Sequence, residues 1–272
     1  MTNSVICNGV VKKMQSTKIQ NIVEYRFDIG SNLIDLNNFI GHSISIKFLD
    51  KIFCQYCKKE IKKAYFQGYC YPCMISAPQA SECILRPELC RAHEGNARDM
   101  NWANDHCLKD HVVYLAITSG LKVGVTRSSQ IPTRWIDQGA IEAVELAVTP
   151  NRFLAGTMEV FLKKHLSDKT HWQKMLKNDY DRSINLLEEK EKIIKLLDRS
   201  YKDYIVYDNE PIINDFPVIK NPEKIKSINF DKQDIVNGEL TGIKGQYLIF
   251  DFETVFNVRR HTGYMINIEI KR

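Results

Sequence analysis

The sequence of 272 residues predicts an α+β protein in which a mixed core lies between two strand-rich segments. Apolar residues recur at every second position near both ends of the chain, which is typical of strands with one buried face. The middle of the chain alternates strand and helix patterns, and seven of the eight cysteines precede it, between Cys54 and Cys107. We therefore expect five segments: an N-terminal β segment (1–50), a zinc-binding region (51–110), an α/β core (111–178), a linker helix (179–201) and a C-terminal β segment (202–272).

The two β segments carry the same kind of pattern. CNGVVKKM, EYRFDIG and SISIKFL in the first, and ELTGIKGQYLIFDF, TVFNVRR and YMINIEIKR in the second, alternate between apolar and polar residues. Antiparallel strands need at least about three partners and a covered face. The segments are therefore expected to pair in one small barrel or sandwich, although two independent sheets would give the same pattern. Apolar residues at helical spacing over 179–201 predict an amphipathic helix that links the core to the last strands.

The strongest motif is the spacing C-x2-C-x12-C-x2-C in CQYC and CYPC. It is made by Cys54, Cys57, Cys70 and Cys73. Two such pairs give the four-thiolate shell that Zn²⁺ favours, and the spacing resembles that of a zinc ribbon or a related zinc finger. Lys62 and Lys63 lie between the pairs, near Tyr65. Basic and aromatic side chains suit contact with nucleic acid, although solvated loops carry them as well.

A second set of candidate zinc ligands is spaced more loosely. It comprises Cys83, Cys90, Cys107 and one of two histidines, His93 or His111. Such a closed site with four ligands would be structural, because it leaves no position for water. In the alternative interpretation, the histidines are ordinary polar residues and the cysteines are small buried hydrophobic residues. The sequence thus predicts one or two structural zinc ions.

The core is expected over residues 111–178. VVYLA and LKVGVT are two strands joined by a tight turn at 117–120, and a helical turn that carries Arg134 follows. AIEAVELAV alternates as a third strand, and a helix is expected from about residue 151 to 166. Glu159 on this helix has apolar neighbours at helical spacing, so its carboxylate needs a partner or a metal ion.

This arrangement resembles a divergent GIY-YIG nuclease core. In that family a tyrosine region handles the attacking water, an arginine contacts the scissile phosphate and a glutamate holds one divalent metal ion. The resemblance implies four catalytic candidates: Tyr114, Lys122, Arg134 and Glu159. It also implies phosphodiester hydrolysis with Mg²⁺ or Mn²⁺ at Glu159. The sequence departs from the family at Lys122, which stands in place of the second motif's tyrosine, and in the first motif, which lacks its glycine.

A longer combination follows the cysteines: HVVYLA, KVGVT, RWIDQGA and TMEVFLKKHLSDKTHW. It resembles the bacterial family known as domain of unknown function 2797, which implies no activity. Each catalytic candidate also has a structural interpretation. Tyr114 can pack in the core, Arg134 can stack on Trp135, and Glu159 can pair with Lys163 on its own helix. Two further polar residues near the core have no assigned role: Gln138 and Asp168.

Composition and charge limit the possible functions. Hydrophobic residues make up 44% of the chain and charged residues 26%, which is typical of a globular protein. The first residues lack the pattern of a secretory signal, and no stretch approaches the roughly 18 apolar residues of a membrane span. We therefore expect a cytoplasmic protein that is not inserted in a membrane; its oligomeric state is not indicated.

Several basic residues near the core predict a nucleic-acid partner, either DNA or RNA. They are Arg127, Arg152, Lys163 and Lys164. The net charge of +5 is compatible with such a polyanion. Three functions follow from these patterns. The protein is a metal-dependent endonuclease or phosphodiesterase, a nucleic-acid-binding protein that has lost catalysis, or a zinc-scaffolded protein-interaction module.

Overall fold

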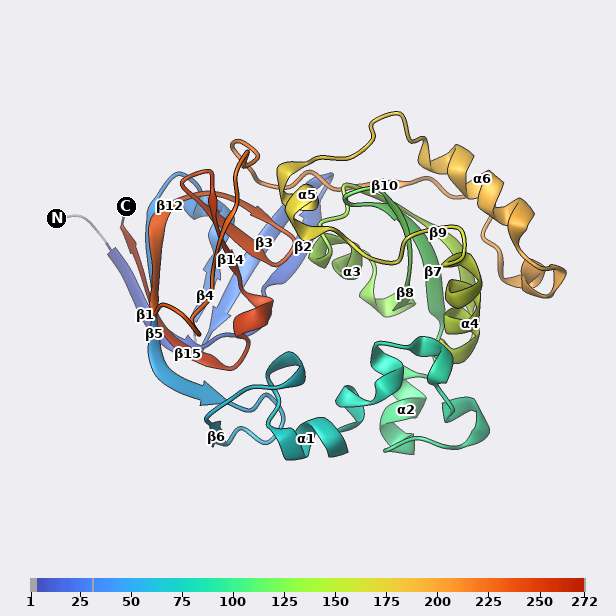
Figure 1. Ribbon diagram of the computed structural model, residues 1–272, viewed down its shortest axis with the longest axis horizontal. Coiled ribbons are helices and arrows are strands. Elements are labelled where there is room, and N and C mark those ends of the chain that lie inside the picture. Colours follow the sequence, from blue (N-terminus) through green and yellow to red (C-terminus); the bar gives the residue numbers. More distant parts are fainter. Residues whose placement is uncertain (1–3, 31, 272) are drawn as a thin grey trace. The chain divides into compact units, whose positions relative to one another are not determined.

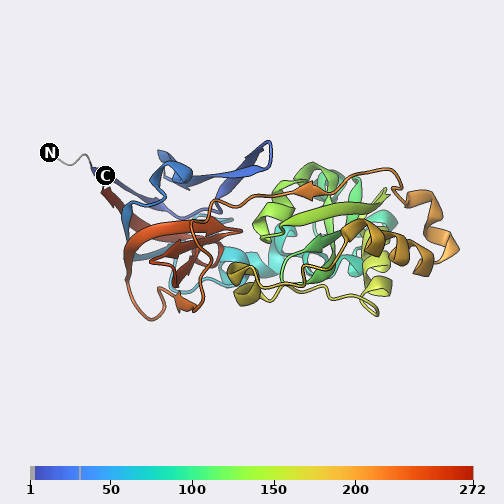
Figure 2. The same cartoon turned by 90° about the horizontal axis from the view of Figure 1, so that it is seen from above.

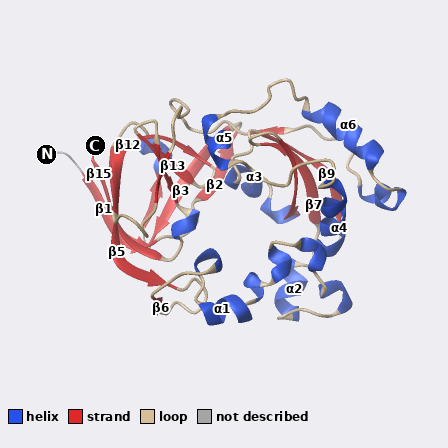
Figure 3. Cartoon of the chain, in the orientation of Figure 1, coloured by secondary structure: helices blue, strands red, loops and turns tan. Residues whose placement is uncertain are grey.

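The computed structural model describes residues 4–30 and 32–271, which belong to two compact units. Unit 1 contains Met1–Ile75 and Asp215–Arg272, and unit 2 contains Ser76–Asn214. Strands dominate unit 1, whereas unit 2 combines helices with a smaller sheet (Figure 3). The boundary between the units therefore falls inside the cysteine-rich segment.

Both ends of the chain contribute to one sheet of unit 1. β1 (Ser4–Val10) pairs antiparallel with β15 (Tyr264–Lys271), and β15 pairs with β5 (Ser43–Phe53). β5 also pairs with β12 (Ile235–Lys244), so the blue and red strands lie side by side in Figures 1 and 2. The N- and C-terminal β segments thus pair with each other in one sheet, and they are not two independent sheets.

The large sheet is open, so the expected small barrel is wrong. Its order is β1-β15-β5-β12-β13-β14-β11, and among the described strands the two at the ends of this order do not pair with each other. Alternation predicts a strand with one buried face, but it carries no information about whether the last strand returns to the first. The remaining strands of this sheet are β13 (Tyr247–Phe250), β14 (Thr254–Asn257), β11 (Lys226–Ile228) and β6 (Glu60–Ile61), which pairs with β5.

A second, three-stranded sheet completes the β structure of unit 1. It consists of β2 (Gln15–Ile19), β3 (Ile22–Ile29) and β4 (Asn32–Asp35). Every second residue of β3 is buried, which places Tyr25 and Phe27 in the core. Burying an apolar side chain of this size contributes about 1.5–3 kcal/mol, so these alternating positions fix the face that the strand turns inward.

Unit 2 contains an antiparallel sheet in the order β10-β9-β7-β8. Its strands are β10 (Ile212–Ile213), β9 (Glu142–Thr149), β7 (His111–Ile117) and β8 (Leu121–Arg127). α3 (Thr133–Asp137) lies between β8 and β9 in the chain, and α4 (Arg152–Leu162) follows β9. The predicted order of strand, strand, helix, strand and helix is therefore present.

β7 is buried on both faces. Val113 and Leu115 pack on the face that α4 covers, together with Met158 and Leu162 of that helix (Figure 1). The alternate residues of β7 pack on the opposite face against Trp135 of α3. β7 is thus a buried inner strand of unit 2, and the packing on both of its faces holds its side chains in fixed positions.

The linker helix is shorter than predicted. α6 spans Leu186–Leu196, and the side chain of Asn185 caps it by accepting bonds from the N–H groups of Leu187 and Glu188. The other α-helices are α1 (Tyr71–Ser76), α2 (Met100–His106) and α5 (Trp172–Lys177). Across the described part of the chain, no helix is long and apolar enough to cross a membrane.

Short 3-10 helices occupy many connections. They are η1 (Leu36–Phe39), η2 (Phe66–Gly68), η3 (Pro78–Ala80), η4 (Glu82–Ile84), η5 (Pro87–Leu89), η6 (Ala92–Glu94), η7 (Ser128–Gln130), η8 (Arg199–Tyr204) and η9 (Arg259–His261). Four of them, η3 to η6, follow one another in the cysteine-rich part of unit 2. This segment has little regular structure, so other contacts must hold it together.

Candidate functional site

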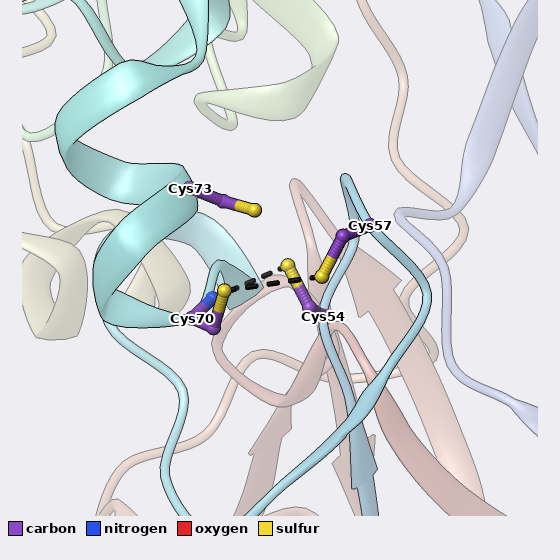
Figure 4. Close-up of side chains that lie close together, drawn as sticks. All are labelled: Cys54, Cys57, Cys70 and Cys73. Carbon is purple, nitrogen blue, oxygen red and sulfur yellow. Dashed lines mark hydrogen bonds between the residues drawn. The ribbon is translucent and has the colours of Figure 1, made fainter.

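The four cysteines of the C-x2-C motifs form one cluster in unit 1. Their sulfur atoms all lie within 4.8 Å of one another, and the side chains point toward a common centre (Figure 4). Cys54 directly follows β5 and Cys57 lies in the turn after it, whereas Cys70 and Cys73 lie just before and within α1. The end of β5 and the start of α1 therefore each supply two thiols. Together they make the four ligands of a tetrahedral zinc site.

Backbone N–H groups favour thiolates at this cluster. The N–H of Cys70 donates to Sγ of Cys54 at 3.2 Å, and Sγ of Cys57 lies 3.9 Å from Sγ of Cys70. Although burial raises the pKa of Cys54, N–H donors from Cys70, Cys57 and Tyr56 lower it to about 6. The hydrogen bond to Cys70 and burial raise the pKa of Cys73 to about 12. Crowded thiolates repel one another, and a dication removes this conflict.

A second cluster lies in unit 2. The sulfur atoms of Cys83, Cys90 and Cys107 are also within 4.8 Å of one another, and Cys90 and Cys107 are buried. Hydrogen bonds with Cys107 and Cys83 lower the pKa of Cys90. Hydrogen bonds with Cys83 and Cys90, together with burial, raise the pKa of Cys107. Both cysteine clusters are thus compatible with structural zinc.

Arg152 joins the second cluster to α4. Its guanidinium donates to the carbonyl oxygens of Cys83 and His106, each at 3.2 Å, and its backbone N–H donates to the carbonyl oxygen of Cys107 at 2.9 Å. Only 8% of Arg152 is exposed. The structure therefore places this residue, predicted to contact nucleic acid, inside the protein as a link between α4 and the cysteine segment.

Close packing of α4 on η5 reinforces this link. A Cβ atom on Gly156 would lie 2.2 Å from the backbone nitrogen of Glu88, so no side chain fits there. α4 also carries Glu159, one turn further along. The position of this carboxylate is therefore coupled to the fold of the cysteine segment.

Polar side chains of β7, of β8 and of Gln138, the residue that follows α3, meet in a buried cluster of unit 2. The hydroxyl of Tyr114 donates to Oε1 of Gln138 at 2.8 Å, and Nζ of Lys122 donates to the same oxygen at 3.2 Å. Lys122 also donates to Oγ1 of Thr170 at 3.4 Å, and Thr170 donates to Thr118 at 3.2 Å. Tyr114 is fully buried and Lys122 is 4% exposed, so these bonds are made away from bulk water.

Arg134 and Glu159 belong to the same electrostatic neighbourhood. Burial lowers the pKa of Lys122 to about 8, and the positive charge of Arg134 acts in the same direction, whereas Glu159 opposes it. Burial raises the pKa of Tyr114, which also hydrogen-bonds to Arg134 and to Gln138. All four predicted catalytic residues are therefore brought together, although 45 positions separate the first from the last.

Glu159 is paired with a lysine on its own helix. Nζ of Lys163 lies 3.3 Å from Oε2 of Glu159 and 3.1 Å from Oδ2 of Asp168. Burial raises the pKa of Glu159, and Lys163 partly offsets this effect. The carboxylate thus shares the ammonium group of Lys163 with Asp168.

Gly124 makes room for the tyrosine ring. It lies opposite Tyr114 in the β7–β8 pairing, and a Cβ atom there would lie 2.5 Å from the tyrosine hydroxyl. The glycine in KVGVT therefore has a local packing reason. Sequence analysis did not identify the contributions of Thr118 and Thr170, because neither residue lies in a recognisable motif.

The other predicted nucleic-acid contacts are not among the residues that make up this cluster. Lys62 and Lys63 are exposed in unit 1, and Nζ of Lys63 lies 5.5 Å from the ring centre of Tyr65. Lys164 is exposed on unit 2, and Arg127 is half-buried at the end of β8. His111, a predicted zinc ligand, is buried at the start of β7.

Comparison with known proteins gives one match. No curated protein and no solved structure matches the chain. The model of one family, described as protein of unknown function (DUF2797), matches residues 41–266. This match includes both cysteine clusters and the whole buried polar cluster. The chain therefore belongs to the DUF2797 family.

Proposed function

We propose that this protein acts on nucleic acid and that the polar cluster of unit 2 hydrolyses a phosphodiester bond. The observation that carries the proposal is that Tyr114, Lys122, Arg134 and Glu159 share one electrostatic neighbourhood. Arg134 is half-buried there, and the other three are buried. These residues come from two strands and two helices, so no local pattern forces them together. They also match, in order, the positions at which the sequence resembles the GIY-YIG nucleases.

The proposal gives each residue one role. Arg134 and Lys122 offer the positive charge that a phosphate oxygen requires as negative charge develops on it. With a pKa of about 8, Lys122 also has a neutral fraction near physiological pH, and neutral lysine accepts a proton. The resemblance implies that Tyr114 orients the attacking water, which has to enter the buried cluster for this step. Gln138 holds the tyrosine and the lysine by accepting a hydrogen bond from each.

Glu159 is the protein ligand for a divalent metal ion in this proposal. Mg²⁺ is usually bound through one or two carboxylates, with water and substrate phosphate as the other ligands, so a single glutamate fits. Because Lys163 also contacts Asp168, it can keep one ionic partner when Glu159 turns to the metal ion. When bound, Mg²⁺ or Mn²⁺ supplies positive charge at the phosphate.

The four-cysteine cluster of unit 1 supports the nucleic-acid part of the proposal. Three tyrosines near the zinc ligands have exposed rings: Tyr56, Tyr65 and Tyr71. Lys62 and Lys63 lie on the same loop as Tyr65. Exposed rings beside basic residues are suited to stack on bases and to attract the phosphate backbone of a single strand.

A second candidate function is nucleic-acid binding without cleavage. Two observations favour it. Lys122 stands where the second motif of the nucleases has a tyrosine. Lys163 forms an ion pair with Glu159, the carboxylate that would hold the metal ion. In this case the cluster would keep its phosphate-binding cations and lack turnover.

The deciding experiment is a cleavage assay on the full chain. Labelled single-stranded, duplex and branched DNA and RNA are incubated with Mg²⁺ or Mn²⁺, using the wild type, Glu159→Gln and the matched control Glu188→Gln. The control glutamate is exposed on α6. Metal-dependent cleavage that is lost only in Glu159→Gln supports the nuclease.

Two other results have distinct meanings. Binding without cleavage, weakened by salt and by Arg134→Ala, supports the binding protein. If the protein neither binds nor cleaves nucleic acid at about 150 mM salt, both functions are rejected. The third expectation, a protein-interaction module, is then favoured. The protein's zinc content is measured on the same sample, so that a loss of structural metal is not mistaken for a loss of function.

A further inference from the structure

The second cysteine cluster is one ligand short of a closed zinc site. Cys83, Cys90 and Cys107 bring three sulfur atoms together, whereas structural zinc is almost always bound by four ligands in a tetrahedron. Three histidines lie in the same part of the chain: His93, His106 and His111. Their surroundings distinguish them.

His93 and His106 have other contacts. The ring of His93 stacks on Phe153 with 4.3 Å between ring centres, and its Nε2 lies 3.8 Å from Glu94. The ring of His106 stacks on Trp102 with 4.1 Å between ring centres, and its Nδ1 donates to the carbonyl oxygen of Trp102 at 2.9 Å. Both rings are held by neighbouring aromatic side chains.

His111 has the arrangement of a metal ligand. Its Nδ1 lies 2.7 Å from the carbonyl oxygen of Lys109, which can only accept a hydrogen bond. The proton therefore lies on Nδ1, and Nε2 carries the lone pair. Among the described residues this Nε2 atom is buried and has no hydrogen-bond partner. Zinc-bound histidines commonly donate one ring N–H to a carbonyl and bind the metal ion with the other nitrogen.

The alternation of β7 places His111 on the side of the sheet that α4 covers. His111 and Val113 lie on the same face of the strand, and this face packs against α4. The first residue of α4, Arg152, holds the cysteine segment through Cys83 and Cys107. His111 therefore lies on the face that packs against α4. Its ring nitrogens are not within 4.8 Å of all three sulfur atoms, so the bound ion would have to draw the four ligands together. The spacing of Cys107 and His111, C-x3-H, is short enough to place both on one ion.

We propose that Cys83, Cys90, Cys107 and His111 bind a second structural zinc ion, with Nε2 of His111 as the fourth ligand. This ion would clamp the irregular segment of η3 to η6 onto the start of β7, three positions before Tyr114. A segment of short 3-10 helices gains order from such a clamp, because zinc binding contributes directly to its folding free energy. The inference does not depend on the proposed nuclease activity.

Metal analysis of the full chain tests this site. The purified wild type is expected to hold two zinc ions per chain, and His111→Ala is expected to hold one, retained by the four-cysteine cluster. His93→Ala serves as the matched control and is expected to keep two. Wild type with only one zinc ion, His111→Ala with two, or His93→Ala with one would each overturn the proposal.

Spectroscopy tests the ligand itself and does not depend on a variant that folds. The two zinc sites together would have eight ligands, seven sulfur atoms and one imidazole nitrogen. X-ray absorption at the zinc edge of the wild type is therefore expected to show imidazole scattering from about one ligand in eight. The absence of imidazole scattering would overturn the assignment. His111→Cys replaces the nitrogen by a thiolate and is expected to keep two metal ions, with a Co²⁺ ligand-field band shifted to longer wavelength. An unshifted band would also count against His111.

Discussion

The hydroxyl group of Tyr114 donates a hydrogen bond of 2.8 Å to the side-chain oxygen of Gln138. The ammonium group of Lys122 donates to the same oxygen at 3.2 Å. One amide thus fixes two side chains that come from adjacent strands. Because both donors are buried, neither has water as an alternative acceptor. Gln138 therefore positions the residues that the proposed chemistry would use.

Replacing Gln138 by Leu is expected to destabilise unit 2 and to disturb the cluster. The substitution leaves two buried donors with fewer acceptors, which costs about 1–3 kcal/mol. Urea unfolding measures the loss, and Gln130→Leu in η7 is the matched control, with an expected change below about 0.5 kcal/mol. Equal unfolding midpoints for wild type and Gln138→Leu would show that the shared acceptor has no energetic role.

The buried ammonium group of Lys122 is expected to make stability depend on pH. Its pKa is about 8 in the folded protein and about 10.5 in the unfolded chain, so the unfolded chain holds the proton more tightly. Charging Lys122 therefore costs on the order of 3 kcal/mol of stability below about pH 8, and this cost is lost as the pH rises from about 8 to 10.5.

Comparison with Lys122→Met isolates this effect. Between about pH 7 and pH 10 the free energy of unfolding of the wild type should rise relative to that of the variant, because the other titrating groups are common to both. If Lys122 also accepts a proton during cleavage, the wild-type rate should rise through about pH 8, and the variant should lack this limb. A parallel pH dependence in the two proteins would contradict the lowered pKa.

The sequence predicts features that depend on residues close together in the chain better than features that depend on distant residues. The four-cysteine cluster was predictable, because each pair of ligands is set by a local C-x2-C turn and the two turns contain all four thiols. Alternation indicated strands at both ends of the chain, but it did not decide between their pairing and two independent sheets. The open form of the sheet did not, because closure depends on contacts between distant edge strands.

The polar cluster was only partly predictable for the same reason. Its resemblance to a known motif indicated Tyr114 and Glu159, but the bonds of Lys122 to Gln138 and Thr170 join residues 16 and 48 positions apart. Nothing in the local pattern around Thr170 indicates such a partner. Arg152 is a different case: its position near the core suggested phosphate contact, whereas its guanidinium is buried and donates to two carbonyl oxygens.

Arg152→Met is expected to destabilise the protein by about 3 kcal/mol. The change leaves the carbonyl oxygens of Cys83 and His106 without their charged donor, in a site where Arg152 is 8% exposed. Lys164→Met removes an exposed cation of the same unit and should change stability by less than about 0.5 kcal/mol. Thermal or urea unfolding compares the two. A stable Arg152→Met protein with weaker nucleic-acid affinity would restore the surface role that the sequence suggested.

The loop between the C-x2-C pairs is expected to bind a single strand through two separable effects. Tyr65 is 41% exposed, with Nζ of Lys63 5.5 Å from its ring centre. Base stacking has no salt dependence of its own, so Tyr65→Ala should weaken binding of single-stranded DNA or RNA by about 1–3 kcal/mol at every salt concentration. Lys63→Ala should instead reduce the slope of log affinity against log salt by about 0.7, because one phosphate contact is lost.

Fluorescence anisotropy with a labelled oligonucleotide over a range of salt concentrations separates these effects. The matched control is Tyr207→Ala, since Tyr207 is 59% exposed on unit 2 and lies outside both cysteine clusters. Its affinity and salt slope should equal those of the wild type. If Tyr65→Ala and Tyr207→Ala bind equally well, the loop does not stack on bases. Any remaining affinity would then come from another basic surface. At this loop, Tyr65→Ala is expected to weaken only the base stacking and Lys63→Ala only the phosphate contact.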